Sequence, residues 1–189
     1  MMRALRMFTA MPRLFERTSA RGRRAVLPGV LLVALAGGMS NVAQAAPTEE
    51  APRIAPDFAL RSVAGSNVRL HELRGQVVLL NFWANACAPC RQSLPRLAQW
   101  QAQYREAGLT VFAIDVDEDA QAARTTVERL DLNYAVLLDT DKTVSRAYAL
   151  GALPTTVLID RDGQVRAVMT KDGAAGAELE RQLQDLLKE

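Results

Sequence analysis

Residues 77–90 read VVLLNFWANACAPC, an apolar run that stops at two cysteines three positions apart. Cys87 and Cys90 are the only cysteines in the 189-residue chain. The run Val77–Trp83 predicts a strand buried on both faces, in the centre of a parallel or mixed sheet. A buried strand that ends at the mouth of a helix keeps two thiols within reach of each other, with one exposed. The stretch therefore indicates redox chemistry.

The elements on either side of this stretch alternate between strand and helix. Helical periodicity is predicted over residues 90–107, 119–130 and 176–188, and a short helix is expected to end at Tyr148. Further strands are predicted at residues 109–115, 135–138 and 155–160. A hairpin is expected at the start of the domain, and the Asp162-Gly163 turn predicts a second one near its end. The order predicts an α/β fold, with a mixed central sheet, helices on both faces and an N-terminal β-hairpin extension.

The first 45 residues have the build of a secretory signal peptide. A basic region ends at Arg23-Arg24, an apolar run follows, and small residues precede a cleavage point after Ala45. The alternative is that the same segment is retained as an N-terminal membrane anchor. We expect residues 46–54 to be a flexible linker, because they are rich in Pro, Glu and Ala, and residues 55–189 to form the folded domain.

The charge of the chain is unevenly distributed. Seven of its 23 basic residues but only one of its 21 acidic residues lie in residues 1–45, so the remainder carries a net charge of −4. Hydrophobic residues make up 49% of the chain, which is typical of a globular domain. A mildly acidic body without a basic stripe gives no reason to expect nucleic acid as a partner.

The cysteine spacing favours a bond that opens and closes. An exported chain meets an oxidising environment, in which structural disulfides are common. A disulfide that closes a loop of two residues stabilises a fold little, however, because it removes little entropy from the unfolded chain. Zinc is the main alternative for this spacing and needs four ligands, whereas the chain offers two cysteines and one histidine, His71. A structural disulfide and a zinc site remain as lesser alternatives, and His71 is expected to be a surface residue. We predict no metal site and no cofactor.

The residues around the cysteines resemble the thioredoxin fold. The stretch Asn81–Arg91 is most similar to the exported TlpA/ResA-like branch, which includes cytochrome c maturation reductases. The resemblance covers about residues 55 to 188 in the order of that family. Further agreement comes from Pro56-Asp57-Phe58, Leu73-Arg74-Gly75, Asp115-Val116-Asp117 and residues 153–163.

This resemblance implies a thioredoxin-like three-layer sandwich and a periplasmic thiol–disulfide oxidoreductase. Cys87 would be the nucleophile and Cys90 the resolving thiol, paired as the redox disulfide. Pro154 would be a cis-proline whose loop binds the substrate backbone beside Leu153. We also expect Trp83 and Pro89 to support the site. Protein disulfides or dithiols are the expected substrates, and a membrane protein is the expected electron donor.

Three positions depart from the pattern of this family. Ala86 stands where relatives usually carry Trp, and Ser93 stands where many carry a buried acid. Asn81 stands where thioredoxin itself has a buried Asp. Because neither usual acid is present, we expect Cys90 to stay largely protonated in the reduced form.

The direction of the reaction is not fixed by the residues, since it depends on how strongly the reduced thiolate is stabilised. We favour a reductase of protein disulfides, as in cytochrome c maturation or metal-site assembly. A disulfide donor is one alternative, and a binding module with an inert or copper-binding cysteine pair is another. A peroxiredoxin is disfavoured, because Ala84 and Cys87 stand three residues before the cysteines, where a threonine would be needed.

Overall fold

The structure, a computed structural model, describes residues 53–189. The predicted export segment, and the predicted linker as far as residue 52, lie outside the described residues. Arg53 and Ile54, which we expected in the linker, form a short strand instead. This strand, β1 (Arg53–Ile54), pairs antiparallel with β8 (Gln164–Thr170). Two residues are too few to show a periodicity, and their partner lies far along the chain, so no local pattern predicts this pairing.

One mixed sheet of eight strands forms the centre of the described chain, in the order β1-β8-β7-β4-β5-β6-β2-β3. The strands β4 (Val77–Trp83), β5 (Leu109–Asp115) and β6 (Ala135–Leu138) run parallel. On the other side of β4, β7 (Thr155–Ile159) runs antiparallel and continues through the Asp162-Gly163 turn into β8. The expected N-terminal hairpin is also present, as β2 (Ala59–Ser62) and β3 (Asn67–Arg69), and it joins the sheet beside β6.

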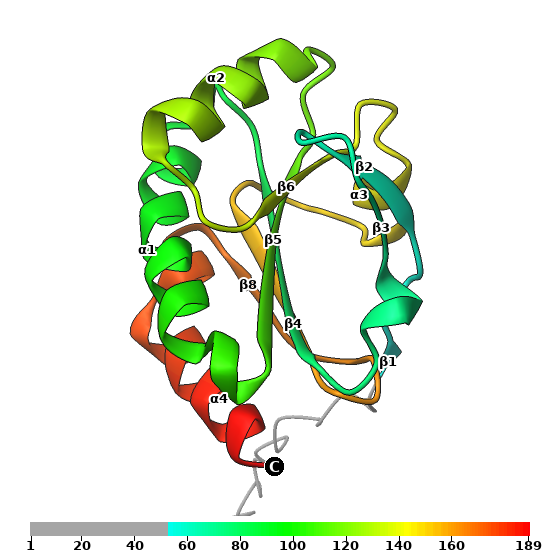
Figure 1. Cartoon of the computed structure of the whole chain (residues 1–189), viewed down its shortest axis with the longest axis vertical. Helices are drawn as coiled ribbons and strands as arrows, with labels where there is room; N and C mark the ends of the chain where they lie inside the picture. The colour runs from blue at the N-terminus through cyan, green and yellow to red at the C-terminus, as the bar shows by residue number, and fades with distance from the viewer. Residues whose placement is uncertain (1–52) are drawn as a thin grey trace, which may run out of the picture. The chain divides into compact units, whose positions relative to one another are not determined.

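Helices cover both faces of this sheet, as predicted (Figure 1). One face is covered by α1 (Ala88–Tyr104), α2 (Ala120–Leu130) and α4 (Ala177–Lys188). The other carries α3 (Thr143–Ala147) and the short 3-10 helix η1 (Leu70–Leu73). Two further 3-10 turns, η2 (Arg105–Ala107) and η3 (Lys171–Ala175), follow α1 and β8. The predicted helix over residues 90–107 thus begins at Ala88 and tightens into η2 before Gly108.

The central strand β4 separates two hydrophobic cores. All seven of its residues are buried. Val77, Leu79 and Trp83 face the core under α1, α2 and α4, whereas Val78, Leu80 and Phe82 face the core under α3 and η1. A strand buried on both faces needs a nearly continuous apolar run, which is why this stretch could be assigned from the sequence. It also places the residues after Trp83 at the carboxyl edge of the sheet.

Within residues 53–189, every helix is too short or too polar to span a bilayer.

Candidate functional site

The two cysteines lie at the junction between β4 and α1. Cys87 is the N-cap residue of α1, and its sulfur accepts a hydrogen bond from the Cys90 amide (3.2 Å). Pro89 lies in the first helical turn, where the missing N–H of a proline costs nothing. Cys87 is half-buried, whereas Cys90 is fully buried in the core under α1. The position therefore leaves Cys87 partly accessible and shields Cys90.

The two sulfur atoms are bonded to each other. The Sγ–Sγ distance is 2.05 Å and the Cα–Cα distance is 5.2 Å. The amides of the first turn of α1 point toward this end of the helix, where the helix dipole favours a negative charge. After reduction, the same amides would favour a Cys87 thiolate, which is the reactive form of a cysteine.

The loop before β7 lies beside the end of β4. The peptide bond between Leu153 and Pro154 is cis. Antiparallel pairing of Phe82 with Thr155 brings this loop next to the residues that follow Phe82. Pro154 is buried and its carbonyl accepts from the Lys171 amide (2.9 Å), while Leu153 is half-buried and contacts both cores. The structure thus brings the two predicted parts of the site, the cysteine stretch and the proline loop, to one edge of the sheet.

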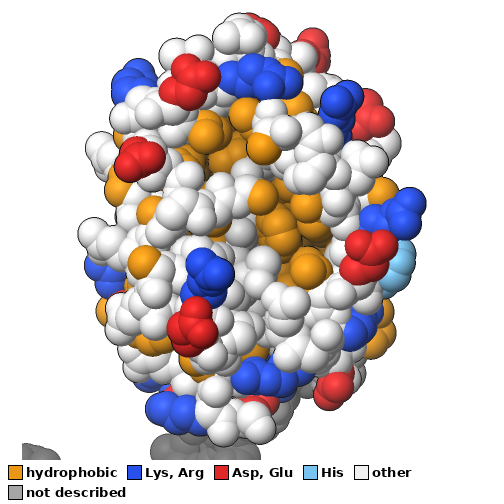
Figure 2. Space-filling model, in the orientation of Figure 1, with side chains coloured by type: hydrophobic (Ala, Val, Ile, Leu, Met, Phe, Trp, Pro, Cys, Tyr) orange, Lys and Arg blue, Asp and Glu red, His pale blue; other side chains and the backbone are white. Residues whose placement is uncertain are grey.

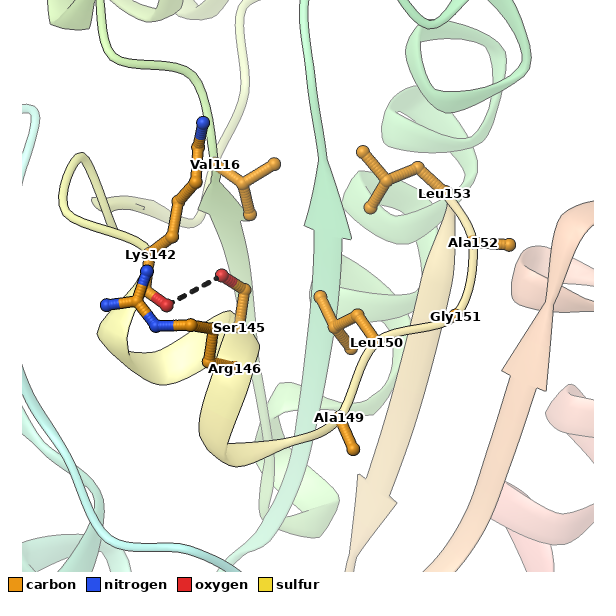
Figure 3. Close-up of a pocket in the computed structure, with 9 residues that line it drawn as sticks. All are labelled: Val116, Lys142, Ser145, Arg146, Ala149, Leu150, Gly151, Ala152 and Leu153. Atoms are coloured by element: carbon orange, nitrogen blue, oxygen red, sulfur yellow. Dashed lines mark hydrogen bonds between the residues drawn. The ribbon is translucent and has the colours of Figure 1, made fainter.

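A pocket of about 560 Å³ opens along this loop. Two of its walls flank β4: Leu153 lies on the β7 side, and Val116, whose amide donates to the Trp83 carbonyl (3.0 Å), lies on the β5 side (Figure 3). Lys142 and Arg146 from the α3 region add two basic side chains. The remaining lining residues are mostly small or aliphatic: Ser145, Ala149, Leu150, Gly151 and Ala152. The space-filling view shows hollows lined by hydrophobic side chains on this face of the molecule (Figure 2).

A polar network fixes the turn that leads into Cys87. Both the amide and the side-chain NH₂ of Asn85 donate to the Asp117 carboxylate, at 2.6 and 2.9 Å. The Thr126 hydroxyl from α2 donates to Asn85 Oδ1 (2.7 Å), and the Arg91 guanidinium donates to the Asn85 carbonyl. Asn85 thereby ties the turn to the loop after β5, to α1 and to α2 at once, which holds the nearby Cys87 in place.

Asn81 and Ser93, the residues that stand in place of the usual acids, are engaged locally. The Asn81 side-chain NH₂ donates to the Thr156 hydroxyl (2.8 Å). The Ser93 hydroxyl donates to the Cys90 carbonyl (2.8 Å). Neither side chain is an acid or a base, so neither can take up a proton from Cys90 near neutral pH.

An acid that the sequence reasoning missed lies close by. Asp115, the last residue of β5, is fully buried. Burial raises the pKa of Asp115 to about 7, with a further contribution from the negative charge of Asp117. In the sequence, Asp115 stands out only as part of a family motif. The available signal was an acid directly after six apolar or β-branched residues, but an acid at a strand end is usually exposed, so the pattern alone did not point to burial.

His71 lies away from this edge. Its ring Nδ1 lies 2.8 Å from Asp57 Oδ2, and its backbone amide donates to Asp57 Oδ1 (3.0 Å). Both side chains are more than half exposed. Among residues 53–189, no three His, Cys, Asp or Glu side chains come together in an arrangement that could hold a metal ion.

Known thiol-disulfide oxidoreductases are similar to this chain in sequence. ResA of a Bacillus cereus strain, named a thiol-disulfide oxidoreductase, is 36% identical over 111 residues, which are 59% of this chain and 64% of that relative. ResA of Bacillus thuringiensis subsp. konkukian is 32% identical over 134 residues, 71% of this chain and 75% of the relative. The chain thus matches just under two thirds of the first relative's length and three quarters of the second's.

A solved structure shows the same fold. The crystal structure of a protein from Chlorobium tepidum, described as a thiol:disulfide interchange protein DsbE, superposes with a TM-score of 0.68 at 36% identity. The superposition covers 72% of this chain and 96% of that one. The predicted thioredoxin-like fold and the resemblance to the ResA-like branch are therefore confirmed. The model of the AhpC/TSA family matches residues 52–168, more than half of the sequence, and the chain belongs to that family.

Proposed function

We propose that this protein is a thiol–disulfide oxidoreductase that acts on protein disulfides and dithiols. The observation that carries the proposal is the asymmetry of the Cys87–Cys90 disulfide at the N-terminus of α1. Cys87 is half-buried at the helix end and Cys90 is fully buried. A purely structural bond needs no such asymmetry, whereas thiol–disulfide exchange needs one sulfur that a substrate can reach.

In the reduced form, Cys87 is the attacking thiol. Its thiolate attacks one sulfur of a substrate disulfide, a mixed disulfide forms, and the other substrate sulfur leaves as a thiolate. Cys90 then attacks the Cys87 sulfur, which restores the internal disulfide and releases the second substrate thiol. The net result is oxidation of one enzyme dithiol and reduction of one substrate disulfide. An external dithiol must then return the enzyme to its reduced form.

The substrate is proposed to lie against the Leu153–Pro154 loop, with one side chain in the adjoining pocket. The loop lies beside the end of β4, so a peptide bound there reaches the turn that carries Cys87. The aliphatic lining suits an apolar side chain, and the two basic residues Lys142 and Arg146 suit a nearby acidic one. Lys142 also forms an ion pair with the exposed Glu118 (3.0 Å), and such a surface pair is weak enough for a substrate carboxylate to compete.

We further propose that the protein works as a reductase in the periplasm, fed by a membrane electron donor. The support is the signal-like segment in residues 1–45 and the similarity to ResA and DsbE proteins. Cytochrome c maturation and metal-site assembly are the processes we would examine first for its substrates.

The test is disulfide reduction by the purified protein and by its Cys87→Ser variant. We expect the wild type to reduce insulin with dithiothreitol as electron source, and the variant to lose at least a hundredfold in rate, because the remaining thiol is buried. A wild-type rate no higher than that of dithiothreitol alone would contradict the proposal and favour a binding module. A glutathione titration of the Cys87–Cys90 pair then decides between reductase and oxidant. A reduction potential of about −270 mV fits a reductase, and one of about −120 mV fits an oxidant.

A further inference from the structure

Asp115 is the last residue of β5, beside the end of the strand that leads to the cysteines. The parallel register pairs Asp115 with Trp83, at the ends of β5 and β4. Figure 1 shows these two strands side by side. Side chains alternate along β5, so Asp115 shares a face with Val111 and Ala113, which belong to the same core as Trp83 and Cys90. Asp115 therefore shares one buried layer with the indole of Trp83 and the resolving sulfur.

Three polar atoms of this layer lack a hydrogen-bond partner among the described residues. They are Asp115 Oδ2, Trp83 Nε1 and Asn81 Oδ1, and all three side chains are fully buried. The other oxygen of Asp115 receives only a long contact from the Asp117 amide (3.5 Å). A buried carboxylate with so few donors is costly in its charged form, so this group holds a proton readily. Native cores leave few such atoms unpaired, so three of them in one layer call for an explanation.

We propose that Asp115 is the buried proton acceptor of this site, coupled to the Cys87–Cys90 pair across the layer that contains Trp83. This role rests on the proposed exchange activity. When Cys90 attacks the Cys87 sulfur of a mixed disulfide, the internal S–S bond forms and the bond to the substrate breaks. The electron pair leaves with the substrate sulfur, and the thiol proton of Cys90 passes to the Asp115 carboxylate. Reduction by an external dithiol returns the proton to Cys90.

Asp115 is suited to this role because its pKa of about 7 lets it both accept and release a proton near neutral pH. Neither Asn81 nor Ser93 can do so. Asp115 thus supplies the acid that is absent from those two positions.

The other ionisable groups around Asp115 do not substitute for it. β4 carries none, and each of the neighbouring groups on the packed elements is engaged in a hydrogen bond of its own. They are Asp117, bound by Asn85; Asp119, the cap of α2; Asp139, bound by two α3 amides; Arg91, on the Asn85 carbonyl; Arg129, on Thr126; and Tyr134, donating to the Leu94 carbonyl.

The test follows the resolving step as a function of pH. Dithiothreitol-reduced protein is mixed with bis(2-hydroxyethyl) disulfide, a neutral probe, and the mixed disulfide is trapped by acid and counted by mass spectrometry between about pH 5.5 and 9. We expect the wild-type rate to rise around pH 7. In Asp115→Asn this inflection should vanish and the rate at pH 7 should fall about tenfold or more. Asp119→Asn, which removes a smaller contribution to the raised pKa of Asp115 but keeps the helix cap, should retain the inflection, with its midpoint moved only slightly to lower pH.

An unchanged pH midpoint in Asp115→Asn, with rates within twofold of the wild type, would overturn the proposal. A second measurement needs no variant, so it stands even if Asp115→Asn misfolds. In carboxyl-¹³C NMR, the titration midpoint of Asp115 in the wild type should differ between the disulfide form and the dithiothreitol-reduced form, and identical midpoints would also overturn it. Failure of the protein to form any mixed disulfide would instead contradict the proposed function.

Discussion

Asp115 and Asp139 invite a direct comparison, because both are fully buried at the carboxyl ends of neighbouring parallel strands. They are even joined, since the Asp139 amide donates to the Asp115 carbonyl (2.9 Å). The Asp139 carboxylate accepts from the Val144 amide (3.0 Å) and the Ser145 amide (2.7 Å) of α3. Asp115 has one unpartnered oxygen and a single long contact on the other.

The difference shows how donors decide the role of a buried acid. Two backbone N–H groups occupy the Asp139 carboxylate, and in return Asp139 satisfies amides at the start of a short helix that lack intrahelical partners. Asp115 has no such donors, so its protonation is free to respond to a change in the redox state of the cysteines. Asp139 therefore has the surroundings of a structural residue, and Asp115 has those of a functional one.

The largest expected effect comes from breaking the structural member of the pair. Asp139→Ala leaves two buried amides of α3 without an acceptor, which should lower the free energy of unfolding by about 2–5 kcal/mol. Urea denaturation monitored by circular dichroism measures this loss. The matched variant Asp115→Ala should cost less, because it removes no satisfied hydrogen bond. Equal losses in the two variants would mean that the two acids do not differ as described.

The next effect concerns the pH dependence of stability. The folded pKa of Asp115, about 7, lies above its unfolded value of about 3.9. The folded state therefore holds a proton that the unfolded state has released between about pH 4 and 7, and the wild type loses stability as the pH rises through this window. Asp115→Asn removes this loss, so it should gain about 4 kcal/mol over the wild type at pH 8.

At pH 4 the same variant should differ little from the wild type. Urea titrations at both values, carried out on the disulfide form, measure the two differences. A gain that is the same at pH 4 and pH 8 would show that Asp115 is not a titrating buried acid.

The smallest effect concerns the surface that Asp139 helps to position. Asp139 anchors the start of α3, and Arg146 projects from α3 at the pocket beside the Leu153 loop (Figure 3). Arg146→Glu should slow the reduction of a peptide disulfide with an acidic flanking residue about three- to tenfold, because like charges then meet. The rate with bis(2-hydroxyethyl) disulfide should not change.

Arg105→Glu, in the exposed turn η2 at the opposite end of the sheet, serves as the matched control for this substitution and should leave both rates unchanged. If Arg146→Glu alters the rate with the neutral probe as strongly as with the peptide, the pocket does not select the substrate by charge.

The parts of the fold that the sequence predicted best are those with a single dominant pattern. β4, β5 and β6 have the predicted bounds, because a strand buried on both faces is an apolar run from end to end. The predicted start of α1 lies two residues late, since Ala88 and Pro89 do not contribute to an apolar stripe. β1 was missed because its two residues gain their structure only from pairing with β8.

In the site, too, local sequence patterns predict some parts, whereas others depend on contacts between distant segments. The cysteine stretch and the proline loop carry local signals, and the sequence order suffices to bring them to one sheet edge. The burial of Asp115 depends on its place in the sheet between Trp83 at the end of β4 and Asp139 after β6, which no single stretch encodes. The pocket likewise combines Val116 with residues of the α3 region and the loop before β7, so its lining could not be read from any one segment.

The short strand β1 also fixes where the preceding chain joins the domain. Arg53 pairs with Val165, which lies level with Ile159 and so with Val78, near the start of β4. Cys87 follows the opposite end of β4, about 20 Å away along a strand of this length. Anything attached through Arg53, whether a tether or a fusion partner, therefore joins the domain near the start of β4, at the end remote from Cys87. A substrate of the proposed exchange reaction would approach at the other end of the strand, where Cys87 lies.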